Sequence, residues 1–91
     1  MNDVRIDTKT AIGLAKNWIT EQFAEEGVED VGLEEVKFAD GCWEITIGFS
    51  RPWDRKGITS LVGPSLLRSY KVIVIKDETG EVVAMRTRQA A

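Results

Sequence analysis

The chain of 91 residues has the length of a single small domain, spanning residues 1–91. Its composition of 43% hydrophobic and 30% charged residues excludes a disordered chain, and no apolar run approaches the roughly 20 residues that span a bilayer. The net charge of −3 argues against a nucleic-acid-binding domain, because such domains are usually basic overall.

Charge is distributed unevenly along the chain. Residues 1–45 carry 11 acidic and 4 basic side chains, whereas residues 46–91 carry 4 acidic and 8 basic ones. This asymmetry predicts oppositely charged patches. Ordinary solvated surface is the alternative, since the two halves of a sequence need not map onto separate surface patches.

Two features of the sequence are typical of a cytoplasmic protein. The first residues, from Met1 to Arg5, lack the basic and then apolar pattern of an export signal. Cys42 is the sole cysteine, so the chain has no internal disulfide, which agrees with a reducing compartment. No membrane partner is expected.

The first predicted element is an amphipathic helix over about residues 8–26. Asp7 or Thr8 can cap it, because either side chain can accept a backbone N–H bond. At about 100° per residue, the apolar side chains fall within an arc of roughly 140°, which predicts a helix lying on a flat apolar surface. They are Ala11, Ile12, Ala15, Trp18, Ile19 and Phe23. Gly27 supplies a left-handed stop.

Two strands, at about residues 31–39 and 42–50, form the clearest predicted hairpin. Asp40-Gly41 between them is a strong two-residue turn signal, because both turn positions need positive φ. After the turn, apolar residues occupy every second position, which is the period of a strand with one face on a core. These residues are Trp43, Ile45, Ile47 and Phe49.

The register of this hairpin follows from its turn. Counting outward gives the pairs Ala39–Cys42, Phe38–Trp43, Lys37–Glu44 and Val36–Ile45. Apolar pairs then share one face and a Lys–Glu pair lies on the other. Upstream, the alternation changes phase once, at Glu34-Glu35, and one extra residue there, a β-bulge, would repair it.

Residues 51–67 show no sustained period and are predicted to form a long loop, which in a small domain is more often functional than idle. The loop begins with the aromatic and basic residues Arg51, Trp53, Arg55 and Lys56. Because Trp and Arg dominate interface hot spots, these four residues are the predicted partner-binding site. The alternatives are that Trp53 packs on the core, or that the four residues stack on bases and grip phosphates.

A second predicted hairpin joins strands at about residues 69–76 and 81–87 through a turn at 77–80. Pairing outward from Lys76 and Glu81 divides the side chains between two apolar faces. The first face carries Tyr70, Val72, Val74, Val83 and Met85, and the second carries Ile73, Ile75, Val82 and Ala84.

The second of these faces, from Ile73 to Ala84, is the predicted dimer face. If the helix covers the face of the first hairpin that carries Trp43, this second face is exposed, and a contiguous exposed apolar surface marks an interface. A homodimer formed sheet to sheet or edge to edge follows. The alternative is that residues 58–67 fold over it.

The order helix, strand, strand, loop, strand, strand predicts an α+β fold, with one N-terminal amphipathic helix packed on a four-stranded antiparallel sheet (α-β-β-β-β). This arrangement resembles the cystatin-like domains, and among them the PepSY type. The resemblance is carried by the spaced alanines Ala11 and Ala15, the strand Cys42-Trp43-Glu44-Ile45, and the hairpin running from Tyr70-Lys71-Val72 to Asp77-Glu78-Thr79-Gly80-Glu81-Val82. The chain is also similar to the shorter nuclear-transport-factor-like immunity proteins, which share the closing pattern.

The resemblance implies a binding role. PepSY-like domains are typically exported and are thought to bind or inhibit peptidases. The Gln-x-Val-x-Gly segment of the cystatin inhibitory loop is absent from this sequence.

Chemistry at a catalytic centre is not expected. The chain has no histidine, which removes the usual general base and the commonest zinc ligand. Cys42 is therefore interpreted as a bystander thiol. The glycines Gly57 and Gly63 are not followed by the Gly-Lys-Ser/Thr of a phosphate-binding loop, and the acidic residues lack the spacing of a calcium loop. The sequence predicts no enzyme, no cofactor and no metal.

The prediction is a non-enzymatic protein-interaction module, with peptidase binding or inhibition as one role. The first alternative is a toxin-neutralising immunity protein that uses the acidic surface of residues 25–35 to bind a basic partner. The second is a small-ligand or single-stranded nucleic-acid binder that uses the 51–57 loop, and nucleic acid is the weaker of these partners.

Overall fold

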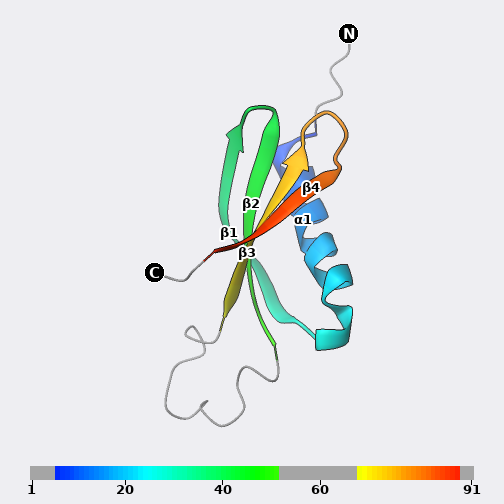
Figure 1. Cartoon of the computed structure of the whole chain (residues 1–91), viewed down its shortest axis with the longest axis vertical. Helices are drawn as coiled ribbons and strands as arrows, with labels where there is room; N and C mark the ends of the chain where they lie inside the picture. The colour runs from blue at the N-terminus through cyan, green and yellow to red at the C-terminus, as the bar shows by residue number, and fades with distance from the viewer. Residues whose placement is uncertain (1–5, 52–67, 89–91) are drawn as a thin grey trace.

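A computed structural model describes residues 6–51 and 68–88 of the chain. One helix packs on a four-stranded antiparallel sheet with the strand order β1-β2-β3-β4 (Figure 1). The elements are α1 (Thr8–Gln22), the 3-10 turn η1 (Ala24–Glu26), β1 (Glu29–Ala39), β2 (Cys42–Ser50), β3 (Ser69–Lys76) and β4 (Val82–Arg88). This order confirms the predicted α+β arrangement.

Helix α1 begins at a side-chain cap. The Thr10 backbone N–H donates to the Asp7 carboxylate at 2.8 Å, which gives a partner to one of the N–H groups that a helix start leaves unpaired. The helix ends at Gln22, earlier than predicted, and the chain continues as the 3-10 turn up to Gly27. Gly27 has a φ of 63°, the left-handed conformation that the sequence predicted.

The Asp7 cap makes stability depend on pH. Hydrogen bonds from Thr10, first from its side chain and then from its backbone, lower the pKa of Asp7 below its ordinary value of 3.8. A lowered folded-state pKa gives stabilisation that is present above 3.8 and is lost as the pH falls through the folded-state value. Asp7→Ala should therefore lower the free energy of unfolding near neutral pH, and this loss should shrink in acid.

Urea denaturation near neutral pH and below the folded-state pKa measures that difference. Thr8→Ala, one residue further along, is the matched control, because the Thr8 side chain is exposed and the capping carboxylate stays in place. An equal loss for Asp7→Ala at both pH values would contradict the capping role.

The first hairpin has the predicted register. The pairs Ala39–Cys42, Phe38–Trp43, Lys37–Glu44 and Val36–Ile45 are all present. Asp40 and Gly41 have φ values of 53° and 75°, as the two-residue turn requires. A register shift lies between Leu33 and Glu35, which confirms the predicted bulge.

The core lies between α1 and one face of the sheet, which we call the helix-side face. Ala11 and Ala15 are fully buried, and their small side chains let the helix backbone come close to the strands. The fully buried core residues are Ala11, Ala15, Ile19, Ile45, Ile47, Phe49, Ile73 and Ile75. The apolar positions of the helix and of β2 thus meet, as their periodicities predicted.

The predicted dimer face is wrong. Ile73 lies opposite Ile45 in the register between β2 and β3, so it shares the helix-side face and is fully buried, as is Ile75. Val82 is partly buried against the same core. Ala84 pairs with Val74 on the other face of the sheet and is exposed, because a register shift displaces the last hairpin by one residue.

Asp77 joins the two hairpin turns at the end of the sheet where α1 begins. Its carboxylate accepts from the Trp43 indole N–H at 2.9 Å, and its backbone N–H donates to the Gly41 carbonyl at 3.0 Å. Its carbonyl accepts from the Ile6 N–H at 3.3 Å. Only 5% of Asp77 is exposed, so these bonds form where water competes little.

Candidate protein-binding site

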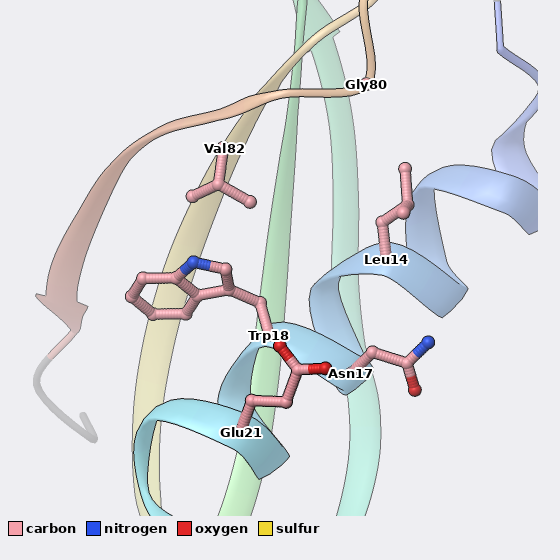
Figure 2. Close-up of a pocket in the computed structure, with 6 residues that line it drawn as sticks. All are labelled: Leu14, Asn17, Trp18, Glu21, Gly80 and Val82. Atoms are coloured by element: carbon pink, nitrogen blue, oxygen red, sulfur yellow. The ribbon is translucent and has the colours of Figure 1, made fainter.

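A groove runs between α1 and the start of β4. It has a volume of about 410 Å³ and is lined by Leu14, Asn17, Trp18, Glu21, Gly80 and Val82, and we call it the Trp18 groove. Figure 2 shows the Trp18 indole beside Val82, with Leu14 pointing toward the Gly80 turn. Trp18 is half-buried, so one part of the indole packs on the core while another part remains accessible.

Strand β4 is an edge of the sheet, with no strand on its outer side among the residues that the structure describes. Its first half, Val82 to Met85, is wholly apolar. Val83 is 49% exposed and Met85 is 38% exposed. Met85 pairs with Ile73 and so lies on the helix-side face, the face on which the Trp18 groove opens. An edge with free backbone groups and exposed apolar side chains is able to pair with another strand.

The opposite edge, β1, is protected against such pairing. Its ladder with β2 has two register shifts, one before Gly32 and one at the predicted bulge, and Asp30 has a φ of 55°. Exposed charged residues also follow the strand: Glu29, Asp30, Glu34, Glu35 and Lys37. Bulges and charges are the usual means of blunting an edge. β4 has one register shift, at Val83, and charged residues only in its second half, so it is the less protected edge, although Leu33 and Phe38 are also exposed on β1.

The predicted partner-binding loop lies almost wholly outside the described residues, which include Arg51 but not Trp53, Arg55 or Lys56. Arg51 donates to the Glu26 carboxylate and to the Ser69 hydroxyl, both at 3.0 Å, and its guanidinium lies 5.7 Å from the centre of the Phe49 ring. Through Glu26 and Ser69, these contacts connect the end of β2 to η1 and to the start of β3. Arg51 thus has a structural role in the fold.

The charge asymmetry of the sequence is largely resolved by pairing within the chain. Each of four ion pairs between described residues joins an acid of the first half to an arginine of the second: Glu26–Arg51, Glu34–Arg68, Glu44–Arg86 and Glu35–Arg88. Gly48 leaves space for the Glu34–Arg68 ion pair, because a Cβ at this position would lie 2.8 Å from both Arg68 Nη2 and Glu34 Oε2. The predicted pair of opposite patches is therefore partly neutralised on the surface.

A second hollow, of about 280 Å³, lies at the far end of β4. Four cationic residues and three hydroxyl-bearing residues line it: Arg51, Arg68, Lys71, Arg88, Ser69, Tyr70 and Thr87. We call it the Lys71 pocket. It shares β4 with the Trp18 groove but differs from it in being polar.

Other kinds of site find little support in the described part of the chain. No group of three or more cysteine, aspartate or glutamate side chains is placed there to hold a metal ion. Cys42 is a free thiol, half-buried beside the first turn. None of the described helices is both long and apolar enough to span a bilayer.

Sequence reasoning did not identify the Trp18 groove. Trp18 belongs to the apolar arc of the helix, as the sequence predicts, but it is only half-buried against the core, so part of its indole remains accessible. The signal that could have found the groove was the wholly apolar start of β4 on a strand that ends the sheet.

Comparisons with known proteins gave no further guide: no protein-family model matches this chain, and no curated protein or solved structure matches it at a significant level.

Proposed function

We propose that this chain is a non-enzymatic protein-interaction module that binds an extended segment of a partner along β4. The observation that supports this most is the position of an apolar, exposed edge strand directly beside the Trp18 groove. In β-strand addition, main-chain hydrogen bonds supply affinity and pockets for alternate side chains supply specificity. β4 offers the main-chain groups, and the groove is a pocket for one apolar side chain.

The groove fits an apolar anchor with a polar flank. Its apolar wall comes from Leu14, Trp18 and Val82, and its rim carries the exposed Asn17 and Glu21. Trp residues in part-exposed positions are common interface hot spots. The groove is small and holds one side chain of the partner. The length of the partner segment is set by β4, so a single segment of about seven residues is the natural ligand.

The alternatives from the sequence are less well supported. An immunity protein that used its acidic surface would need free carboxylates, yet Glu26, Glu34 and Glu35 are paired with arginines of the same chain. A binder of nucleic acid through the 51–57 loop would draw on Arg51, which is held by Glu26 and Ser69. Peptidase binding fits the proposal as one class of partner and remains a prediction.

Selection from a library of random linear peptides displayed on phage, followed by amide NMR mapping, tests the proposal. Peptides that bind should shift the amides of β4 and the Trp18 indole. Met85→Lys should weaken binding by about tenfold or more, because it removes exposed apolar area beside the groove. Leu33→Lys is the matched control, since Leu33 is 42% exposed on the same face at the opposite edge.

Two results would overturn the proposal. One is a peptide that binds with shifts on β1 and not on β4. The other is binding that Met85→Lys leaves unchanged while Leu33→Lys weakens it. If β4 instead pairs with β4 of a second copy, light scattering will give twice the monomer mass, and selected peptides will compete with the dimer.

A further inference from the structure

The Lys71 pocket contains a cation that no carboxylate of the described residues neutralises. Three of its four positive side chains have a carboxylate from elsewhere in the chain: Arg51 has Glu26 at 3.0 Å, Arg68 has Glu34 at 3.7 Å and Arg88 has Glu35 at 3.1 Å. Lys71 has none within residues 6–51 and 68–88. Its ammonium group donates to the Thr87 hydroxyl at 2.8 Å, and two of its three N–H donors remain.

Two hydroxyl groups of the pocket are polarised toward a further acceptor. Thr87 accepts from Lys71, and Ser69 accepts from Arg51 at 3.0 Å. A hydroxyl that accepts from a cation keeps its own proton to donate, and such chained hydrogen bonds strengthen one another. The pocket therefore presents one unbalanced positive charge and two oriented O–H donors, a combination that suits an oxyanion.

The charge balance selects the kind of anion. One unpaired cation matches a single negative charge, as on a carboxylate, more closely than the two charges of a phosphate monoester. The pocket volume of about 280 Å³ is several times the roughly 30 Å³ share of one water molecule, so it can admit a whole acidic side chain or a chain terminus.

We propose that the Lys71 pocket is a carboxylate-binding subsite for the partner segment that docks on β4, an inference that rests on the proposed function. Val82 at the Trp18 groove and Thr87 at the Lys71 pocket are five residues apart on β4, which is roughly 17 Å at the spacing of an extended strand. Both sites open on the helix-side face, and side chains on one face of an extended segment recur at every second residue. The partner segment thus carries an apolar side chain at one end and a carboxylate an even number of residues away, about four or six.

A titration with sodium acetate, followed by amide NMR at constant ionic strength, tests the subsite without a peptide. Acetate should give saturable shifts at Ser69, Lys71 and Thr87. Lys71→Met, which keeps the length of the side chain, should weaken acetate binding by about tenfold or more, the usual effect of losing one charge-assisted hydrogen bond. Lys76→Met, at the exposed other end of β3, should leave the titration unchanged.

Three results would overturn the subsite: shifts that rise linearly without saturation, shifts that Lys71→Met does not reduce, or inorganic phosphate binding at least tenfold more tightly than acetate. The peptide selection separates the two proposals. Selected peptides that bind β4 without enrichment of Asp or Glu would overturn the subsite and leave the proposed function standing. Saturable acetate binding without any peptide on β4 would overturn the proposed function and leave an anion site.

Discussion

Ile73→Lys is expected to unfold the domain, or to lower its free energy of unfolding by at least about 4 kcal/mol. Ile73 is fully buried opposite Ile45 and beneath α1, so an ammonium group there would have neither water nor a carboxylate partner. A domain of this size has a total stability on the order of 5–10 kcal/mol, so the loss would be close to the whole. Urea denaturation followed by circular dichroism measures it.

Ala84→Lys is the matched control for that change. Ala84 lies on the same hairpin, but it is exposed on the face of the sheet opposite α1. A lysine there should change the free energy of unfolding by no more than about 0.5 kcal/mol, the usual range for surface substitutions. If Ile73→Lys folded as stably as Ala84→Lys, the assignment of Ile73 to the core would be wrong, and the prediction that Ile73 lies on an exposed dimer face would be supported again.

Asp77→Ala is expected to lower the free energy of unfolding by about 2–3 kcal/mol. The substitution leaves the part-buried Trp43 indole N–H without its acceptor, and an orphaned buried donor costs roughly 1–3 kcal/mol. It also loosens the contact between the turn of the first hairpin and that of the last, which Asp77 joins through its backbone as well. Thermal and urea unfolding of the variant measure the loss.

A double-mutant cycle with Trp43→Phe isolates the indole–carboxylate bond. In the Trp43→Phe background no indole donor is left unpaired, so Asp77→Ala should cost about 1 kcal/mol less than it does in the parent chain. Equal costs in the two backgrounds would show that the Asp77 side chain acts through contacts other than the Trp43 indole.

The first hairpin could be predicted because its determinants are local. Asp40-Gly41 sets the turn, the turn sets the pairing, and the phase change at Glu34-Glu35 can be read within a few residues. Each of these features acts over a short stretch of chain, where backbone preference and side-chain period agree.

The position of the last hairpin could not be predicted in the same way. Its relation to the first depends on the register between β2 and β3, which joins residues far apart in the sequence and places Ile73 opposite Ile45. The register shift at Val83 is not marked by a glycine in the sequence, yet it moves Ala84 to the face of the sheet opposite α1. A pattern of alternating residues gives two faces but does not say which one the helix covers.

The candidate site was missed for a similar reason. The sequence directed attention to the aromatic and basic residues after β2, whereas the Trp18 groove forms only where the middle of α1 meets the start of β4. The uneven charge of the two halves was visible in the sequence, but pairing across the sheet, as between Glu35 and Arg88, is a product of the fold.

The central claim is that the outer edge of β4 is free to pair with another strand, and amide hydrogen exchange of the protein alone tests it most directly. The amides of β4 that point away from β3 should exchange rapidly at every protein concentration, while those that point toward β3 should be protected. Protection of both sets at low and high concentration would mean that the edge is already paired, and the proposed docking site would not exist.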